Sequence, residues 1–308
     1  MISRRNIRIN VLQTIYETNQ QEKGFQEAIA IKNLASKFDK TNELYIASIQ
    51  LMYAITQYVL IYANQRASKM APTFEDLHVK TKIAGNTIIE SLKMNENFAD
   101  LVKKYKLAHL FDEDTIKSLF LLLSKSSEYQ TYISSEERTP IEEKQILETI
   151  MDICIFGNED TASLLAEIYM NWYNDFEMIY TWFQKMLMNT KQAKFNKIIG
   201  DVKLEYAEEL LKCYYNKKQI VFDIINPKLV NWDSERIANI DLIILHLGVC
   251  EFLYFETIPF KVTINEYIDL AKSYSTQQSG QFINGLLDNV RKDLEKNNLV
   301  YKTDFHKK

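Results

Sequence analysis

The chain contains few of the residues that usually form turns. Only seven glycines and four prolines occur in 308 residues. Because tight turns depend on glycine and proline, this scarcity argues against a many-turned β-protein and against an α/β sheet. Hydrophobic residues make up 46% and charged residues 25%, as in a globular protein rather than a disordered one. Long segments rich in Leu, Ile, Lys and Glu therefore predict an all-α fold.

The residues and motifs of common catalytic sites are also scarce. Three cysteines occur at wide spacing, without a CxxC pair, and this predicts reduced thiols that pack in the core. The four histidines are scattered, and the P-loop, GxSxG, HExxH and GxGxxG motifs are absent. We therefore expect no enzymatic activity, no catalytic residues, no metal site and no cofactor.

No long apolar segment marks the chain for secretion or for a membrane. An apolar signal segment does not follow Met1. The most apolar stretch, 240–255, is shorter than the roughly 20 residues of a bilayer span and is interrupted by Asp241, His246 and Glu251. This stretch predicts a buried central helix, in which His246 is a core or interface residue. We expect a cytoplasmic protein without membrane contact.

The net charge is −4, so a nucleic-acid site would have to be a local basic patch. The first sixteen residues hold Arg4, Arg5 and Arg8 and no acid. On an ideal helix these arginines lie within an arc of about 100°. They also crowd the positive end of the helix dipole, where cations are unfavourable. Two interpretations are open, a basic start that aids solubility and a patch whose arginines grip phosphate oxygens.

Helix boundaries follow from capping residues and from periodicity. A long helix is predicted near 40–66, and 204–225 reads as one amphipathic helix that Pro227 stops. Asp233 or Ser234 is expected to cap the apolar helix that follows. Between 70 and 200, polar residues that precede helical segments are predicted N-caps, namely Thr73, Asp112, Thr139 and Asn158.

Two glycines stand close together in the segment "SGQFINGLLDNV", residues 279–290. A glycine in a helix interior costs about 1 kcal/mol relative to alanine. Ser279 as N-cap would place Gly280 in the first turn, where the cost is small. For Asn284 and Gly285 we expect close helix packing.

The C-terminal third of the chain resembles the bacterial transcription antitermination factor NusB. The resemblance covers 235–290, with the blocks "IPFKVTINEYIDLAK" and "SGQFINGLLD". The start "RRNIRINVLQTIY", residues 4–16, is similar to the family's arginine-rich first helix, and 206–227 is similar to its central helix. The resemblance implies an all-α, NusB-like helical bundle.

Family members of ordinary size join these two ends by a much shorter chain. The expected organisation is therefore a first helix with its connection at 1–39, a helical insertion at 40–200, a C-terminal bundle at 201–300 and a tail at 301–308. The insertion is about 160 residues long. The same fold also precedes an RNA cytosine methyltransferase domain, which we do not expect here.

The resemblance implies an RNA-binding factor that pairs with NusE, a ribosomal protein of the small subunit. Such a pair binds boxA-type single-stranded RNA in nascent ribosomal transcripts and joins the RNA polymerase elongation complex through other Nus factors. Aromatic rings would stack on bases and amides would read base edges. The residues carried over as RNA-binding are Arg4, Arg5, Arg8, Tyr274, Gln277, Gln278, Ser279, Gln281 and Phe282.

Several of these residues have a second interpretation. Phe282 is spaced with Leu286 as a core aromatic would be. The expected NusE contacts are Tyr16, Asp241 and Phe260, each of which could instead complete the core. The family often has an acid where this chain has Gln277 or Gln278, and two neutral amides would repel phosphate less.

An alternative function is open as well. The chain could be a protein–protein interaction scaffold or a ribosome-assembly factor that uses the insertion as its main surface. Binding to phosphates falls steeply with salt whereas an apolar interface hardly responds, so salt dependence separates the two functions.

Overall fold

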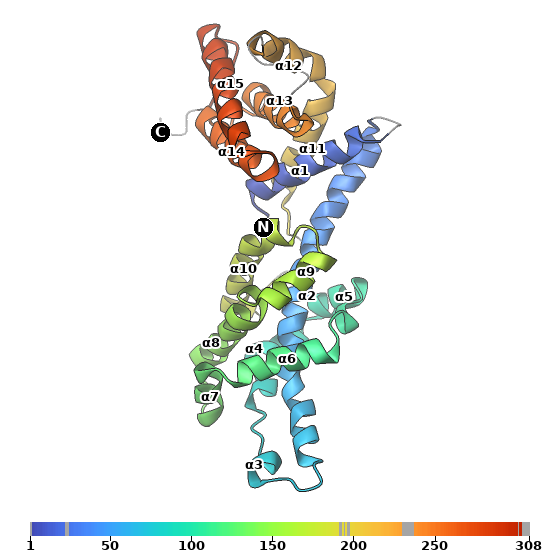
Figure 1. Cartoon of the computed structure of the whole chain (residues 1–308), viewed down its shortest axis with the longest axis vertical. Coiled ribbons are helices and arrows are strands. Elements are labelled where there is room, and N and C mark those ends of the chain that lie inside the picture. Colours follow the sequence, from blue (N-terminus) through green and yellow to red (C-terminus); the bar gives the residue numbers. More distant parts are fainter. Residues whose placement is uncertain are drawn as a thin grey trace. The chain divides into compact units, whose positions relative to one another are not determined.

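The structure is a computed structural model that describes residues 2–21, 25–190, 193, 195, 198–229, 237–300 and 302–303. Every regular element in these residues is helical (Figure 1), which confirms the all-α prediction. The chain forms two compact units. The terminal unit comprises Ile2–Lys37 and Ile199–Lys308, and the middle unit comprises Phe38–Ile198. Whether the middle unit is an insertion stays a prediction.

The terminal unit is built around one apolar helix. Residues 243–252 of this helix, α13, are all buried, as its sequence predicted. The side chains of Ile7, Val11 and Ile15, four residues apart on α1, are buried in the same core. The helices of this unit are α1 (Arg4–Asn19), α11 (Asp201–Asn216), α12 (Lys218–Ile225), α13 (Asn239–Tyr254), α14 (Phe260–Tyr274) and α15 (Gln277–Lys296), with the short 3-10 helix η5 (Asn226–Lys228).

Two helix predictions in and near this unit need correction. The segment 204–225, predicted as one helix, forms two helices, α11 and α12, because the backbone leaves the helical conformation at Lys217. The predicted caps Asp233 and Ser234 lie outside the described residues, and α13 begins at Asn239 after Ala238.

The long helix α2 (Glu27–Ala67) begins thirteen residues before the predicted start at 40. Ala30, Leu34 and Phe38 are buried at a spacing of four residues, which continues the apolar face toward the N-terminus. By length and composition alone α2 could span a membrane, but 67% of its most apolar window is buried inside the protein. That burial is typical of a core helix in a globular protein.

The middle unit is a set of mostly short helices beside the greater part of α2. Each of the four predicted N-caps, Thr73, Asp112, Thr139 and Asn158, accepts a hydrogen bond from a backbone N–H three residues later, which confirms them. The further helices are α3 (Phe74–Leu77), α4 (Thr87–Lys93), α5 (Glu96–Lys104), α6 (Glu113–Ser124), α7 (Ser127–Ser134), α8 (Pro140–Ile150), α9 (Glu159–Ile168) and α10 (Trp172–Met188), the 3-10 helices η1 (Lys82–Gly85) and η2 (Leu107–His109), and the π-helix η3 (Met151–Phe156).

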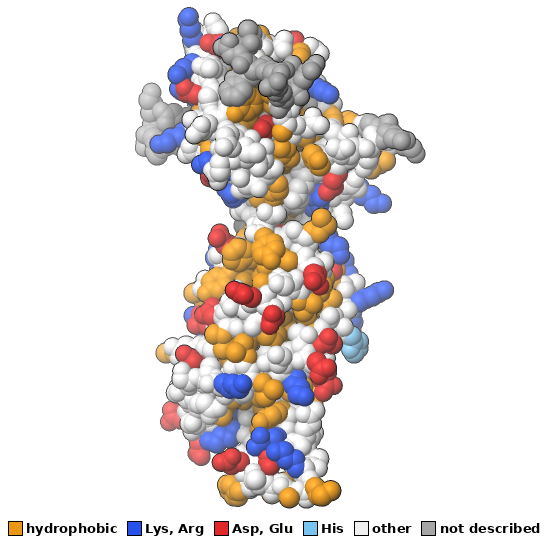
Figure 2. Space-filling model, in the orientation of Figure 1, with side chains coloured by type: hydrophobic (Ala, Val, Ile, Leu, Met, Phe, Trp, Pro, Cys, Tyr) orange, Lys and Arg blue, Asp and Glu red, His pale blue; other side chains and the backbone are white. Residues whose placement is uncertain are grey.

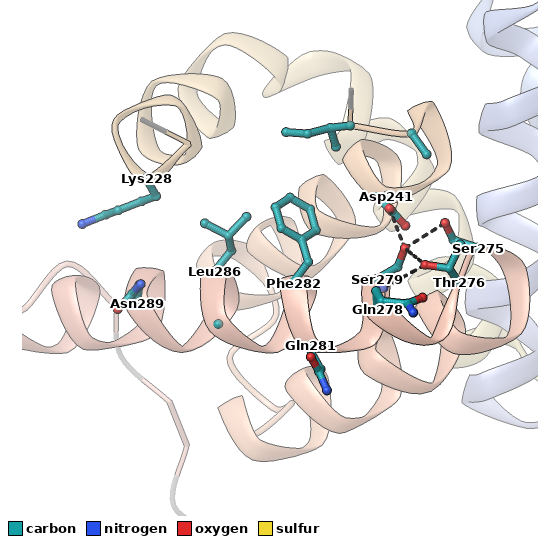
Figure 3. Close-up of a pocket in the computed structure, with 13 residues that line it drawn as sticks. Lys228, Asp241, Ser275, Thr276, Gln278, Ser279, Gln281, Phe282, Leu286 and Asn289 are labelled. Atoms are coloured by element: carbon teal, nitrogen blue, oxygen red, sulfur yellow. Dashed lines mark hydrogen bonds between the residues drawn. The ribbon is translucent and has the colours of Figure 1, made fainter. Parts of the chain in front are cut away.

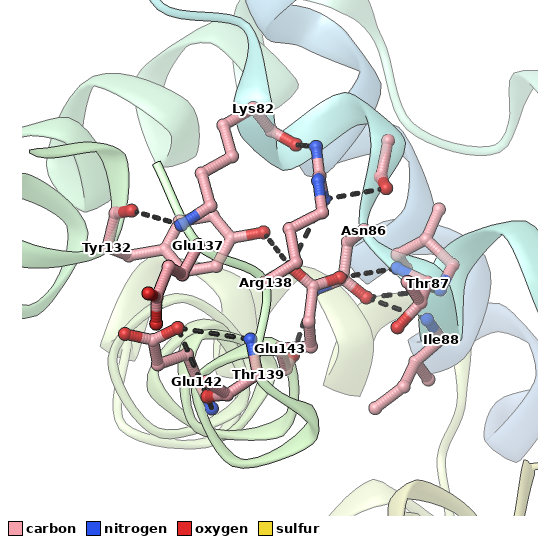
Figure 4. A network of polar contacts seen from close by, with 12 residues as sticks. Lys82, Asn86, Thr87, Ile88, Tyr132, Glu137, Arg138, Thr139, Glu142 and Glu143 are labelled. Carbon is pink, nitrogen blue, oxygen red and sulfur yellow. Dashed lines mark hydrogen bonds and ion pairs between the residues drawn. The ribbon is translucent and has the colours of Figure 1, made fainter. Parts of the chain in front are cut away.

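A polar network fastens three of these helices together (Figure 4). Glu143 on α8 is buried and accepts hydrogen bonds from the Tyr132 hydroxyl at 2.6 Å and from Arg138 at 3.1 Å. The Asn86 side chain caps α4 and donates to the Glu143 carbonyl at 2.8 Å. Arg138 also donates to the Gly85 carbonyl at 2.8 Å. The network therefore joins α4, α7 and α8 and engages both terminal nitrogens of the Arg138 guanidinium.

Candidate nucleic-acid interface

The last helix, α15, begins three residues earlier than predicted. Thr276 is its N-cap, because its backbone is extended and its hydroxyl oxygen accepts from the Ser279 N–H at 3.1 Å. Ser279 is not a cap, and its side chain is buried. The Ser279 hydroxyl donates to Asp241 at 2.8 Å and lies within 3.0 Å of the hydroxyls of Ser275 and Thr276 (Figure 3). Its predicted role as an RNA contact is therefore wrong, because this cluster uses both its donor and its acceptor capacity.

A hollow of about 1000 Å³ lies along the first three turns of α15 (Figure 3). We call it the α15 hollow. Its wall contains Phe282, 7% exposed, beside Leu286, while the amides of Gln278 and Gln281 are exposed at its edge. Its lining residues are Lys228, Ile237, Ala238, Asp241, Ser275, Thr276, Gln278, Ser279, Gln281, Phe282, Gly285, Leu286 and Asn289.

The other two residues predicted for this RNA-facing segment do not line the hollow. Gln277, the first residue of α15, is exposed next to it. Tyr274, the last residue of α14, is half-buried. Of the residues predicted for this segment, the exposed ones are the glutamines at 277, 278 and 281. Their amides are therefore accessible to a ligand.

The two glycines of α15 differ in their surroundings. A Cβ atom added to Gly280 would lie 2.9 Å from Cγ of Lys272, so α14 approaches the backbone closely there. A Cβ added to Gly285 would meet nothing within 4 Å. Both Gly285 and Asn284 are exposed, so the predicted close helix packing at these residues is wrong. Gly285 instead lines the α15 hollow and leaves its backbone open to a ligand.

Arg8 is buried and cannot contact RNA, which corrects its predicted role. Its side chain is 1% exposed, and its guanidinium makes two bonds to Glu251, at 2.7 and 3.1 Å, and one to Glu266 at 3.1 Å. The hydroxyls of Tyr206 and Tyr267 donate to Glu251 at 2.6 and 2.9 Å. Burial alone would lower the pKa of Arg8, but the Glu251 carboxylate raises it above its ordinary value. Arg8 thus joins α1 to α13 and α14.

Arg4 and Arg5 remain on the surface of α1. The Arg5 guanidinium lies 3.6 Å from Asp269 on α14, with both side chains about half exposed, and the Arg4 guanidinium lies 5.8 Å from the centre of the Tyr206 ring. Exposed contacts of this kind are worth about 1 kcal/mol or less, so a phosphate can replace them. Asp269 precedes Lys272, which covers Gly280, by three residues on α14. Helix α14 therefore contacts both Arg5, through Asp269, and the start of α15, through Lys272.

The structure does not gather the three predicted partner contacts into one surface. Tyr16 is exposed and lines a second hollow of about 1100 Å³, which we call the Tyr16 hollow. Asp241 lines the α15 hollow instead, bonded to Ser279. Phe260, at the start of α14, packs edge-on against Phe252 with 4.9 Å between ring centres.

The Tyr16 hollow also contains an aromatic stack and a buried histidine. The rings of Phe25 and Tyr215 stack with centres 3.7 Å apart. His246 also lines the hollow, with Nε2 3.2 Å from the Lys218 carbonyl oxygen and its ring against Tyr214. Burial lowers the pKa of His246 to about 4, so this side chain is neutral at physiological pH.

Sequence reasoning missed two polar residues of the α15 hollow. Asn289 continues the spacing of Gln278, Gln281 and Gly285 on one face of α15, so helical periodicity could have identified it. Lys228 comes from another element, η5, and no pattern in the sequence links it to α15. Within the described ranges, no group of three or more His, Cys, Asp or Glu residues could hold a metal ion.

Comparison with known proteins identifies relatives of the C-terminal part of the chain. The sequence model of the NusB family matches residues 173–292. That match begins in α10 of the middle unit and ends in α15. No solved structure matched the chain.

Among the relatives named transcription antitermination protein NusB, three illustrate the extent of the match. The protein of Fervidobacterium nodosum is 34% identical over 122 residues, which are 39% of this chain and 78% of the relative. That of Methylacidiphilum infernorum is 45% identical over 89 residues, 29% of this chain and 62% of the relative. That of Bacillus pumilus is 42% identical over 90 residues, 29% of this chain and 69% of the relative.

Proposed function

The chain belongs to the NusB family, and from this premise we propose that it is an RNA-binding transcription antitermination factor that pairs with NusE. Its RNA ligand would be a boxA-type single strand in nascent ribosomal transcripts. The protein would act in the cytoplasm, in the RNA polymerase elongation complex, through other Nus factors. The relatives are named for antitermination and not for a catalysed reaction, in keeping with the lack of catalytic motifs.

The α15 hollow is the observation that supports RNA binding most directly. Its edge presents the exposed amides of Gln278 and Gln281, with Gln277 beside them, and amides can hydrogen-bond to the edges of unstacked bases. Its wall contains the Phe282 ring and the side chain of Leu286, against which a base can pack. Three amides and an apolar wall are what a single-stranded segment with splayed bases requires.

Arg4 and Arg5 would hold the RNA backbone. Both guanidiniums are exposed and make only surface contacts, so their donors can turn to phosphate oxygens. Arg8 would support them indirectly, because its buried pair with Glu251 fixes α1 on the bundle. Ser279 would likewise act by positioning the start of α15 through Asp241.

For NusE we propose the Tyr16 hollow. It combines an exposed tyrosine, the Phe25–Tyr215 stack and the neutral His246, a mixture of aromatic and polar groups typical of protein interfaces. Of the other two predicted partner residues, Asp241 bonds to Ser279 and Phe260 packs on Phe252. We therefore assign direct contact with NusE to Tyr16 alone.

Fluorescence anisotropy with a labelled boxA-like RNA tests the proposal. The full chain is titrated alone and with NusE from the same organism, against a scrambled RNA of equal composition. The test variant is Arg4→Ala/Arg5→Ala. The matched control is Lys103→Ala/Lys117→Ala, which removes the same charge from exposed positions of the middle unit.

We expect preferential binding of boxA-like RNA that NusE strengthens and that the arginine variant weakens at least tenfold, while the lysine control stays within about twofold of the wild type. Equal binding of both RNAs, or equal losses in the two variants, would contradict a specific site on the terminal unit. An effect of Tyr16→Ala on the NusE-dependent gain alone would locate the partner at the Tyr16 hollow.

A further inference from the structure

A hollow in the middle unit, unrelated to the proposed RNA site, is lined by aromatic rings and acids. It lies between the π-helix η3 and α10 and has a volume of about 480 Å³. Three rings, of Phe156, Phe176 and Tyr180, and two carboxylates, of Asp152 and Glu177, form most of its lining. We call it the aromatic–acidic hollow. Gly157 and Thr181 complete it.

The π-helix places two of these side chains. Its wider turn carries Asp152 and Phe156 toward α10. π-helical turns are rare in proteins, and those that occur are often found at functional sites. Gly157 ends it, and a Cβ there would lie 2.2 Å from the Asp152 carbonyl oxygen, so only glycine fits. The Thr161 hydroxyl donates to the Cys154 carbonyl at 2.8 Å, which satisfies a group that the irregular turn exposes. The local backbone is thus specified by several residues.

The rings are held in a fixed arrangement around the acids. Phe156 meets Tyr180 edge to face, with ring centres 5.2 Å apart, and stacks on Trp172 at 5.6 Å. The Tyr180 hydroxyl donates to one oxygen of Asp152 at 2.9 Å, which orients that carboxylate. Within the described part of the chain, neither Asp152 nor Glu177 has a cation within 4.0 Å. Both carboxylates therefore face the hollow without a counter-ion.

The surrounding segment is strongly acidic. Residues 126–184 contain twelve acids and only two bases, Arg138 and Lys144. Both bases already form ion pairs, Arg138 with Glu143 at 3.1 Å and Lys144 with Glu148 at 3.0 Å. Figure 2 shows acidic side chains interspersed with apolar ones on the face of the middle unit where α9 lies. This segment therefore carries ten more acids than bases.

A second hollow adjoins the first. Its volume is about 510 Å³, and it shares Asp152 with the aromatic–acidic hollow. Glu128, Glu142 and Glu148 also line it. Acidic groups therefore continue from α10 across η3 to α8 and α7, a longer track than a single small molecule would occupy.

We propose that this track binds an arginine- or lysine-rich segment of a partner protein, with one cationic side chain in the aromatic–acidic hollow. A guanidinium or ammonium there would meet ring faces and two unpaired carboxylates together, which is the lining that cations prefer. A second cationic side chain would occupy the adjoining hollow. RNA is excluded as the ligand, because twelve acids repel phosphate. The site goes beyond the proposed antitermination function and lies in the other unit.

Anisotropy of a fluorescein-labelled octapeptide of alternating Arg and Gly, titrated with the full chain at low salt, tests this proposal. An octapeptide of alternating Glu and Gly is the charge control. The variants are Glu177→Gln, which leaves an exposed residue of equal size, and Phe176→Leu, which removes a ring. Glu167→Gln is the matched control, since Glu167 is exposed in the same acidic segment but lines neither hollow.

The basic peptide should bind and the acidic one should not. Glu177→Gln and Phe176→Leu should each weaken binding about threefold to tenfold, with Glu167→Gln within about 1.5-fold of the wild type. Equal losses for Glu177→Gln and Glu167→Gln would overturn the site in favour of diffuse attraction, as would full affinity in Phe176→Leu. Binding of boxA-like RNA, measured on the same samples, should not change, so failure here is separable from failure of the proposed RNA function.

Discussion

The guanidinium of Arg8 and the carboxylate of Glu251 are both withdrawn from solvent, with 1% and 0% of their side chains exposed. Removing one partner leaves the other as an uncompensated buried charge, which costs about 3–5 kcal/mol. The side chain of Arg5, by contrast, is 43% exposed and lies beside the exposed Asp269, so its removal leaves no buried charge. Arg8 should therefore contribute to stability, while Arg5, three positions away on the same helix, is free to make the RNA contact that we propose.

Arg8→Ala should lower the free energy of unfolding by about 3–5 kcal/mol, whereas Arg5→Ala should change it by less than about 0.5 kcal/mol. Urea unfolding followed by circular dichroism measures both. Arg5→Ala should nevertheless weaken RNA binding. Similar stabilities for the two variants would show that the Arg8–Glu251 pair does not hold α1 in place.

His246 makes stability depend on pH. Its pKa is lowered by burial to about 4, while the unfolded chain has a value near 6.5. As the pH falls from 6.5 to 4, His246 becomes protonated in the unfolded state but stays neutral in the folded state. The free energy of unfolding therefore decreases. Between pH 7 and pH 5 this loss should reach about 2 kcal/mol. In His246→Phe the loss over the same interval should be smaller by that amount, as urea unfolding at the two pH values measures.

Gly285 offers a test in which stability and binding should change in opposite directions. No neighbour requires glycine there, so Gly285→Ala should raise the free energy of unfolding by up to about 1 kcal/mol through helix propensity. If RNA approaches the backbone in the α15 hollow, the same methyl group should weaken RNA binding several-fold. A more stable variant with unchanged RNA affinity would remove Gly285 from the binding surface.

At the scale of helices, local rules predicted much and long-range contacts little. The caps at Thr73, Asp112, Thr139 and Asn158 were predictable because an N-cap needs only the residues that follow it. The cap of α15 was placed at Ser279 and not at Thr276, since two hydroxyl residues compete and only the contact with Asp241 decides between them. Burial of Arg8 likewise depends on Glu251, which is 243 positions away in the sequence.

The first turn of α15 permits a charge test of the RNA site. Gln278→Glu should weaken RNA binding several-fold at low salt, because a carboxylate at the edge of the α15 hollow repels phosphate. Gln277→Glu combined with it should weaken binding further. Acidic side chains in the first turn of a helix interact favourably with the helix dipole, so the free energy of unfolding should not decrease. Asn284→Asp adds the same charge to an exposed residue of α15 outside the hollow and serves as the control; equal effects of Gln278→Glu and Asn284→Asp would indicate that only net charge matters.

For the whole molecule, charge is divided between the two units. Residues 38–198 carry seventeen basic and twenty-two acidic side chains, whereas the rest of the chain carries twenty basic and nineteen acidic ones. This division of charge agrees with the two proposals, in which RNA binds the terminal unit and a cationic partner binds the middle unit. The sequence resemblance could indicate the first of these roles, because its motifs lie at the two ends of the chain. The second depends on side chains from η3 and α10 that meet only in the folded unit.

The most direct test of the central claim is the salt dependence of boxA-like RNA binding by the full chain and by Arg4→Ala/Arg5→Ala. Each phosphate contact contributes a slope of about −0.7 to the logarithm of affinity against the logarithm of salt concentration for single strands. Loss of two contacts should make the slope less negative by about 1.4, while Lys103→Ala/Lys117→Ala should leave it unchanged. Parallel slopes for the wild type and the arginine variant would contradict the assignment of RNA phosphates to α1.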